Sequence, residues 1–464
     1  MTGNLAGSLR RLVAEDLAAQ DDIDLQGDDR REYARQRIFA HLDALAVGPP
    51  SAGEIAPTVL EEQMLAQSVL DALFGMGRIQ ALIDDPSIEN IDINGCDRVW
   101  ATFADGSKRI MEPVADSDDE LVEMMRSAAG RFGLSERRFD MGRPELDLRL
   151  PDGSRLSALM AVSARPCVSI RRHRFADLSI AELIGLGTLG EDIASLLSAA
   201  VRAKKNIVVA GAMNSGKTTL MRALAAEISP RERIVTIEQA FELGLENMPE
   251  RHPDMVALEA RPANVEGEGL ISVADLVRRA LRMNADRVIV GEVLGDEILP
   301  MLNAMSQGRS GSMCTIHSNS SGGVFRRVAA YAVQAPERLP LEATNLLIAG
   351  SIHFVVFLDS DSDDGAADEL GFVGAGRGWD RPETSDLDGV RTQFAAQTHR
   401  HRFISSIREV VDAEGVQVIS NEIYRPGSDR RAVPGSPLRP QTLGELVRFG
   451  YQPTGNHQTT GACE

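Results

Sequence analysis

The sequence predicts an α/β protein in which a doubly wound, mostly parallel sheet follows a smaller α+β domain. From residue 206 onward, short apolar runs alternate with segments of helical spacing, and this alternation is typical of parallel sheets. Runs such as 288–290 and 354–357 are apolar at every position, as strands buried on both faces are. Closely spaced strand-like runs with Asp-Gly turns precede this region and indicate hairpins.

The composition is that of a globular protein with more than one domain. The chain has 464 residues, 43% of them hydrophobic, so we expect two or three domains. The net charge of −19 argues against a nucleic-acid groove as the main working surface, and we expect no nucleic-acid partner. No apolar run reaches the roughly 18 residues of a membrane-spanning helix, so we expect no membrane span. The four cysteines, which lie far apart and fit a reducing cytosol without a zinc site or disulfide framework, are Cys96, Cys167, Cys314 and Cys463.

Residues 1–58 are predicted to form a helical appendage and a linker. Residues 8–20 and 29–46 have amphipathic helical spacing, and Gly and Pro are concentrated at 48–53, which indicates a linker. A helix lying on a membrane surface is the alternative for this segment. The mixed charges at 15–22 argue against that alternative.

Residues 59–175 are predicted to form the small, sensor-like α+β domain. Its expected elements are a helix over 59–82 with a weak point at 75–77, a strand pair over 87–94 and 98–103, a helix over 118–132, and a hairpin of 146–150 and 155–162. The domain ends in the sequence CVSIRRHRF, where Arg171, Arg172 and Arg174 concentrate positive charge. Charge runs are usually solvated faces, and contact with a phosphate from outside the main domain is the functional alternative.

Residues 206–430 are predicted to form the main domain, after a connector and helix over 176–205. An acidic insertion at 359–388 lacks periodicity and is expected to be flexible, and a Pro- and Gly-rich tail occupies 431–464. The expected strands are 206–210, 234–238, 287–291, 312–316 and 354–358, with a late strand pair over 403–411 and 416–424 and a short helix near 442–449.

The first strand of the main domain leads into an octapeptide with the spacing G-x-x-x-x-G-K-[ST], and a segment of helical spacing over 219–228 follows. Strand, glycine loop and helix in this order are the context of a P-loop. Backbone N–H groups of such a loop wrap a polyphosphate at a helix N-terminus. We therefore expect ATP and Mg²⁺ to bind there, with Lys217 on the β- and γ-phosphates and the Thr218 hydroxyl on the metal. The predicted binding residues are Gly211, Ala212, Met213, Asn214, Ser215, Gly216, Lys217, Thr218 and Thr219.

Three strand ends supply candidate catalytic residues. Glu292 follows the apolar run 288–290, at the strand end where open α/β sheets bind ligands. Hydrolysis needs a group that orients water, and we assign this role to Glu292, a surface acid being the alternative. Glu238 ends a second strand and is expected to hold Mg²⁺ together with Glu292. His317 ends a third strand, where a γ-phosphate sensor and an ordinary histidine are equal alternatives.

A helix over 276–283 places two cations on one face. Arg278 and Arg282 are four residues apart, so their side chains are neighbours on a helix surface. Such a pair requires an anion, either a phosphate or carboxylates of the same chain. Both are candidate nucleotide ligands, and we expect at least one to pair with acids.

Several motifs in order resemble one family of ATPases: DDPSIENIDING (84–95), LPDGSRLSA (150–158), VSIRRHRF (168–175), GAMNSGKTT (211–219), IVTIEQAFEL (234–243), LEARPANVEGEG (258–269), DLVRRALRMNADRVIVGEVLGDE (275–297) and GSMCTIHSN (311–319). They resemble the type II/type IV secretion ATPases and, within these, the Tad/Flp pilus assembly ATPases. The resemblance covers roughly residues 60–358, with weaker similarity to about 450. It implies a hexameric ring, a RecA-like main domain, and ATP bound between the two domains.

The resemblance also implies residue roles and partners. In this family the acids matched by Glu238 and Glu292 serve Mg²⁺ and water, the segment of His317 lies near the γ-phosphate, and arginines matched by Arg171 and Arg172 approach the nucleotide. The partners would be polytopic inner-membrane platform proteins, on which a cytoplasmic chain would dock.

Three positions depart from the family's pattern: Gln239 replaces an aspartate, Leu294 an arginine, and Arg309 a histidine. One lost carboxylate and one lost arginine would slow turnover, since charged contacts at a transferring phosphoryl group contribute orders of magnitude in rate. The leading hypothesis is an ATP-hydrolysing motor for pilus assembly or secretion. The alternatives are a nucleotide-gated scaffold that hydrolyses weakly and, in third place, a DNA-handling P-loop ATPase.

Overall fold

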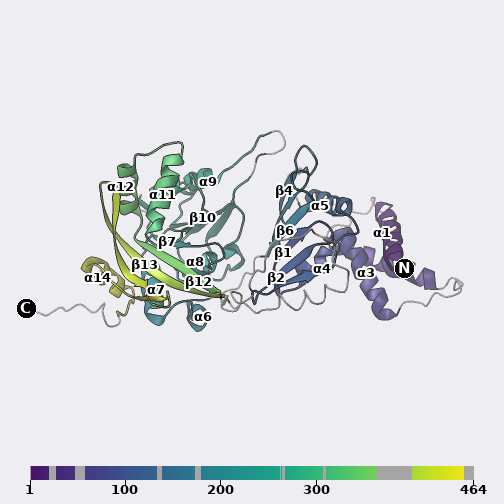
Figure 1. The fold of residues 1–464 in the computed structure, drawn as a ribbon, viewed down its shortest axis with the longest axis horizontal. Coiled ribbons are helices and arrows are strands. Elements are labelled where there is room, and N and C mark those ends of the chain that lie inside the picture. The colour runs from purple at the N-terminus through teal and green to yellow at the C-terminus, as the bar shows by residue number, and fades with distance from the viewer. Residues whose placement is uncertain are drawn as a thin grey trace, which may run out of the picture. The chain divides into compact units, whose positions relative to one another are not determined.

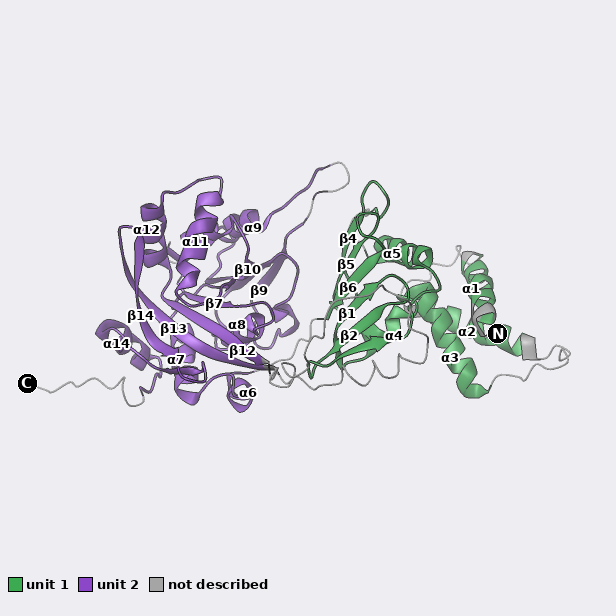
Figure 2. Cartoon of the chain, in the orientation of Figure 1, with its two compact units in different colours: residues 1–173, 377–397 green, residues 174–376, 398–464 purple. Residues whose placement is uncertain are grey.

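The computed structural model describes residues 2–19, 28–46, 58–132, 138–172, 179–261, 263, 267–306, 310–362 and 400–453. The described residues up to 172 belong to one compact unit and those from 179 onward to a second (Figures 1 and 2). The predicted linker at 48–53, most of the acidic insertion, Arg174, Arg309 and Cys463 lie outside the described residues. Among the helices that are described, none combines the length and apolar character needed to cross a bilayer.

The first unit begins with a cluster of three helices that has its own apolar core. The helices are α1 (Thr2–Ala18), α2 (Asp28–Ala46) and α3 (Val59–Phe74). Leu9 of α1, Ile38 of α2 and Val69 of α3 are all buried in this core. The two helices predicted for the appendage are therefore present, and they pack against the helix that follows them.

The long helix predicted over 59–82 is two helices. Helix α3 ends at Phe74, and α4 (Ile79–Asp84) starts after a turn in which Gly77 has a φ of +55°. Glycine adopts this left-handed conformation without steric cost. The break coincides with the weak point expected at 75–77.

The described part of the first unit that follows these helices consists of a six-stranded antiparallel sheet, in the order β3-β2-β1-β6-β5-β4, and the helix α5. Its elements are β1 (Ile88–Asn94), β2 (Val99–Phe103), β3 (Lys108–Met111), α5 (Asp118–Phe132), β4 (Glu145–Arg149), β5 (Arg155–Leu159) and β6 (Cys167–Arg171). Both predicted hairpins are present, and β6 joins them by pairing with β1 and β5. Alternate residues point to one face, and Ile91, Leu156 and Ile170 form a core there with α4 and α5.

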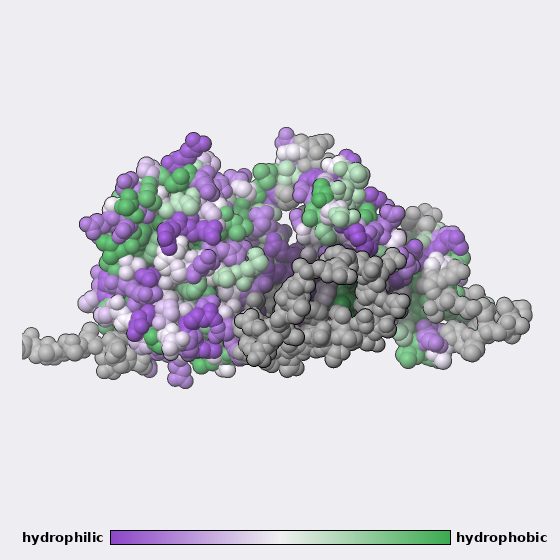
Figure 3. Space-filling view, in the orientation of Figure 1, coloured by the Kyte–Doolittle hydropathy of each residue, from purple (hydrophilic) through white to green (hydrophobic). Residues whose placement is uncertain are grey.

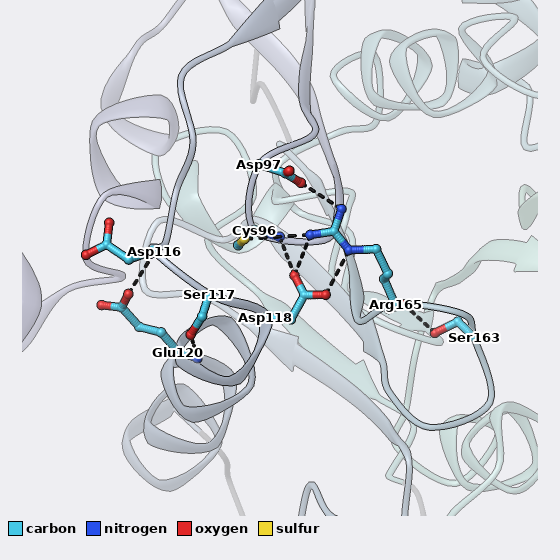
Figure 4. A network of polar contacts seen from close by, with 8 residues as sticks. All are labelled: Cys96, Asp97, Asp116, Ser117, Asp118, Glu120, Ser163 and Arg165. Atoms are coloured by element: carbon cyan, nitrogen blue, oxygen red, sulfur yellow. Dashed lines mark hydrogen bonds and ion pairs between the residues drawn. The ribbon is translucent and has the colours of Figure 1, made fainter. Parts of the chain in front are cut away.

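The turn between β1 and β2 is fastened by an ion-pair network (Figure 4). Arg165 donates from Nε and Nη2 to the two carboxylate oxygens of Asp118, at 2.8 and 2.7 Å, and from Nη1 to Asp97 at 2.7 Å. The guanidinium holds the pKa of the Asp118 carboxyl well below its usual range. Gly95, with a φ of +78°, lies where a Cβ would overlap this guanidinium. The network thus ties the turn to the start of α5.

The second unit contains a nine-stranded mixed sheet, in the order β15-β14-β13-β12-β7-β11-β10-β8-β9. The strands from β12 to β9 in this order are parallel, and β13, β14 and β15 extend the sheet in antiparallel pairing. Their bounds are β7 (Ile207–Gly211), β8 (Ile234–Glu238), β9 (Met255–Glu259), β10 (Arg287–Val293), β11 (Met313–His317), β12 (Phe354–Ser362), β13 (Arg400–Glu414), β14 (Gln417–Pro426) and β15 (Ala432–Pro434).

Helices cover both faces of this sheet. Figure 1 shows α11 and α12 on one side and α6 and α7 on the other. Ile207 and Val209 of β7 pack in the core of the layer with α6, α7 and α8, whereas Val208 and Ala210 pack in the opposite core. The helices are α6 (Ile180–Gly185), α7 (Glu191–Arg202), α8 (Lys217–Ala225), the short 3-10 helix Leu245–Asn247, α9 (Val273–Ala280), α10 (Ile298–Ser306), α11 (Gly323–Gln334), α12 (Leu341–Ser351) and α14 (Pro440–Arg448).

The α/β prediction is confirmed, with three differences in detail. The five predicted parallel strands are all present, but β9 was not predicted. Its apolar run, 255–258, is only four residues long and half-buried at the sheet edge, and so short a run does not by itself distinguish a strand from a helix. The late strand pair is longer than expected and belongs to the main sheet. The connector expected over 176–205 contains two helices, α6 and α7, which share the second unit's core. On the visible face of this unit, hydrophilic and hydrophobic side chains are interspersed (Figure 3).

Candidate active site

The loop between β7 and α8 curls around its own lysine. Asn214 (φ +60°) and Gly216 (φ +91°) have left-handed backbones, which turn successive N–H groups toward one concavity. Lys217 is buried, and its Nζ donates to the carbonyl oxygen of Ala212 at 2.9 Å and lies 3.4 Å from that of Gly211. The loop therefore has the backbone geometry of an anion-binding turn at a helix N-terminus.

This loop fits a polyphosphate. The buried Oγ of Ser215 has no hydrogen-bond partner in the described part of the chain, although buried polar groups are normally paired. A Cβ at Gly211 would lie 2.7 Å from the carbonyl oxygen of Leu358, so glycine is needed where the strand enters the loop. An anion seated in the concavity would give Ser215 a partner.

His317 and Glu292 lie beside this loop in one row. Strand β11 runs between β7 and β10, and His317 pairs in register with Gly211. Lys217 Nζ lies 3.2 Å from Nδ1 of His317, and Nε2 of His317 lies 2.6 Å from Oε1 of Glu292. Because an ammonium only donates, Nδ1 is the side of the ring that can accept from Lys217, and Nε2 is the side that can donate to the carboxylate. The row therefore connects the lysine at the start of α8 with the histidine of β11 and the carboxylate of β10.

Glu238 ends β8 at the same sheet edge but is deeply buried, with 2% of its surface exposed. Its Oε2 accepts the backbone N–H groups of Glu242 and Leu243 at 2.8 and 2.9 Å. Its Oε1 is buried without a hydrogen-bond partner among the described residues. Burial raises the pKa of this carboxyl to about 7, so its charge depends on whether a cation is nearby.

The candidate magnesium ligands fit a site completed by the nucleotide. Among the described residues, no group of three or more His, Cys, Asp or Glu side chains is arranged to hold a metal ion. Mg²⁺ is commonly bound by one or two protein ligands together with substrate phosphates and water. Thr218 in the first turn of α8, the unpartnered oxygen of Glu238, and Glu292 are the groups that would serve such an ion.

The four arginine candidates are not part of this row. Arg278 pairs with Asp275 at 3.4 Å and Glu337 at 3.3 Å, as the structural alternative expected. The carbonyl oxygen of Met283, the residue after Arg282, accepts a hydrogen bond from Nε of Arg233. Arg233 directly precedes β8. This contact places the exposed Arg282 near the N-terminal ends of the strands, the edge opposite the loop. Within one chain, the prediction that Arg278 and Arg282 contact the nucleotide is therefore not supported.

Arg171 and Arg172 belong to the first unit and differ from each other. Arg172 donates to the carbonyl oxygens of Asp85 and Ile88 and lies 3.9 Å from the Asp152 carboxylate. Its side chain is thus used in the unit's own fold. Arg171 is exposed, and its side chain has no hydrogen bond or ion pair with any residue that the structure describes.

Two of the family departures are visible. Gln239 is exposed directly after Glu238. Leu294 is 52% exposed, two residues after Glu292, and its backbone N–H is bonded to Glu297. Neither side chain replaces the charge expected at its position.

One loop contact was missed by the sequence analysis. Arg402 of β13 donates from Nε to the carbonyl oxygen of Asn214 at 3.0 Å. No spacing in the sequence predicts this contact, because it depends on β13 pairing with β12 beside the loop.

Comparison with known proteins identifies the family. The family model for type II/IV secretion system proteins matches residues 73–392. The chain belongs to this family. A candidate conjugal transfer protein of Mycobacterium tuberculosis strain H37Rv is 35% identical over 268 residues, which cover 56% of this chain and 73% of that protein.

Other relatives belong to type IV secretion systems. The PtlH homolog of Bordetella bronchiseptica is 30% identical over 321 residues, which cover 63% of this chain and 91% of that protein. A crystal structure of the VirB11 ATPase of Brucella suis, in complex with sulphate, matches at 25% identity and a TM-score of 0.32, covering 67% of this chain and 94% of that one. The type II/IV secretion family consists of ATP-hydrolysing hexameric proteins, and this member is an ATPase that binds nucleotide.

Proposed function

We propose that this secretion-family ATPase is a hexameric motor that uses ATP hydrolysis at the Lys217 loop to drive assembly of a Tad/Flp-type pilus. The observation that supports hydrolysis is the row formed by Lys217, His317 and Glu292, which joins the phosphate loop to a carboxylate through a 3.2 Å and a 2.6 Å contact. The motor would work at the cytoplasmic face of the inner membrane, docked on polytopic platform proteins.

Each residue of the site has a distinct role in ATP hydrolysis. The backbone N–H groups of the loop and Lys217 bind the triphosphate, and Mg²⁺, when bound, neutralises charge on the phosphate oxygens. Glu292 accepts a proton from the attacking water and orients it. His317 holds Glu292 in place through Nε2–H. When the ammonium of Lys217 binds phosphate instead, Nδ1 of His317 loses its contact with Lys217. Because Nε2 of the same ring contacts Glu292, nucleotide binding then affects the position of the carboxylate.

Replacing Glu292 tests this assignment. Glu292→Gln keeps the shape but removes the proton acceptor, so we expect the rate of phosphate release to fall by about 10²–10⁴-fold while ATP still binds. Glu342→Gln, an exposed acid on α12, is the matched control and should leave the rate unchanged. Steady-state phosphate release and equilibrium ATP binding are the measurements. Unchanged turnover in Glu292→Gln would reject the catalytic role.

A weakly hydrolysing scaffold is the second candidate function. It is favoured by the exposed Gln239 and Leu294, which leave two expected charges absent. Robust Mg²⁺-dependent phosphate release from the purified hexamer, sized in solution with ATP, would exclude the scaffold. The Tad/Flp assignment is tested in cells that encode Glu292→Gln: loss of surface pili supports it, whereas intact pili with blocked protein secretion contradict it.

A further inference from the structure

An arginine contacts the phosphate loop from the side opposite the catalytic row. Arg402 lies near the start of β13 and pairs with Ser360 of β12, and Leu358 of β12 pairs with Gly211 of β7. The strand order β13-β12-β7-β11-β10 therefore places Arg402 and Glu292 on opposite flanks of the loop.

The contact is close and leaves part of the guanidinium available. Nε donates to the carbonyl oxygen of Asn214 at 3.0 Å, and a Cβ at Gly216 would lie 3.2 Å from Cδ of Arg402. The side chain is exposed, and it forms no other hydrogen bond or ion pair with the residues that the structure describes. One edge of the guanidinium is thus fixed to the loop, and none of the described residues bonds to its Nη donors.

The direction of a bound nucleotide follows from the catalytic row. If Glu292 activates water, the γ-phosphate lies on the β11–β10 side of the loop. A triphosphate bound along the N-terminus of α8 then places its nucleoside on the other side, toward β12 and β13. Among the described residues, Arg402 donates a side-chain hydrogen bond to the loop from that side.

We propose that Arg402 binds the nucleoside of the bound purine triphosphate, with the guanidinium face stacked on the base while Nε stays on Asn214. Guanidinium groups stack on aromatic faces, and a planar group that is already anchored loses less conformational freedom on binding. The proposal rests on the proposed nucleotide site at the Lys217 loop. It makes Arg402 a specificity residue, which distinguishes a nucleoside triphosphate from the triphosphate alone.

The test compares two ligands that share the phosphates. Calorimetric titration of the full chain with ATP and with inorganic tripolyphosphate, both with Mg²⁺, gives one dissociation constant for each. Arg402→Ala should weaken ATP binding about tenfold, a loss of about 1.4 kcal/mol, and change tripolyphosphate binding less than twofold. Arg402→Lys keeps a donor for Asn214 but lacks the planar face, so it should also weaken ATP selectively. Arg425→Ala, an exposed arginine on the neighbouring β14, should change neither constant.

The outcomes separate this inference from the function on which it rests. Unchanged ATP affinity in Arg402→Ala would overturn the nucleoside contact. An equal loss for both ligands would also overturn it, because Arg402 would then only shape the loop. Wild-type protein that binds neither ligand would overturn the proposed nucleotide site itself. If Arg402→Ala fails to fold, as judged by its thermal melting, the selective loss is sought in Arg402→Lys, and its absence there overturns the proposal.

Discussion

Two titratable residues of the second unit, the buried Glu238 and the half-buried His353, respond to pH in opposite directions. Burial raises the pKa of Glu238 from about 4.5 in the unfolded chain to about 7, so the folded state binds more protons between these values and loses stability as pH rises. Burial lowers the pKa of His353 from about 6.5 to about 4, so the folded state binds fewer protons and gains stability as pH rises. The two effects oppose each other between about pH 4.5 and 6.5.

Replacing either residue should therefore reveal the effect of the other on the pH dependence of stability. From pH 5 to 6.5, we expect the free energy of unfolding to stay nearly constant in the wild type without nucleotide or Mg²⁺. It should rise by about 2 kcal/mol in Glu238→Gln and fall by a similar amount in His353→Asn. Urea titrations measure these slopes, with the second unit's transition assigned by hydrogen exchange of β7 and β10 amides. Parallel slopes in the two variants would contradict the assignment.

The candidate site was predictable where its residues lie on single strands or in one contiguous loop. His317 and Glu292 lie at the ends of two parallel strands, and Lys217 lies in the loop that follows a third. Strand ends meet at one sheet edge, so their proximity followed from the pattern. The burial of Glu238 did not, because it depends on how residues 239–243 fold back over the carboxylate. The contact of Arg402 was equally hidden, since the sequence predicted the pairing of β13 with β14 but not its pairing with β12.

At the scale of elements, β10 contains a glycine that is required by the neighbouring strand. A Cβ at Gly291 would lie 2.8 Å from Cγ and 3.0 Å from Oε2 of Glu238, closer than packed atoms approach. Gly291→Ala should therefore push Glu238 from its backbone partners and destabilise the protein by about 1–3 kcal/mol. Denaturant unfolding measures this loss.

Gly444→Ala is the matched control for this prediction. Gly444 lies exposed within α14, and nothing approaches a Cβ there within 4 Å, so alanine should stabilise the protein by about 0.5–1 kcal/mol. The double variant Gly291→Ala with Glu238→Ala should lose less than the sum of the single changes, because the clashing side chain is gone. Strict additivity would show that Gly291 does not act through Glu238.

Elements were predictable in proportion to how uniformly they are buried. Strands β7, β8 and β11 are buried at nearly every position, which produces the apolar runs that identified them. Strand β9 is half-buried along its length. Strand β13 pairs with β14, which follows it directly in the chain, and also with β12, from which residues 363–399 separate it. Pairing order is a tertiary property, so the antiparallel extension of the main sheet was not visible in local patterns.

At the scale of the whole molecule, the two units have separate apolar cores, so we expect two unfolding transitions. A non-hydrolysable ATP analogue with Mg²⁺, at 100 times its dissociation constant, should stabilise the second unit by about 2.7 kcal/mol. For a unit of this size, that shift corresponds to about 5–10 °C. Calorimetric scans measure both transitions, and Lys217→Ala should abolish the shift of the second unit.

The first unit's transition tests the role proposed for its arginines. If Arg171 contributes to nucleotide binding, the analogue should raise this transition as well, and Arg171→Ala should remove that shift while leaving the melting temperature without nucleotide unchanged. Arg172→Ala should instead lower the melting temperature without nucleotide, because its guanidinium bonds to Asp85 and Ile88. Arg98→Ala, an exposed arginine before β2, is the control. If the analogue leaves the melting temperature of the first unit unchanged in the wild type, the nucleotide site is limited to the second unit.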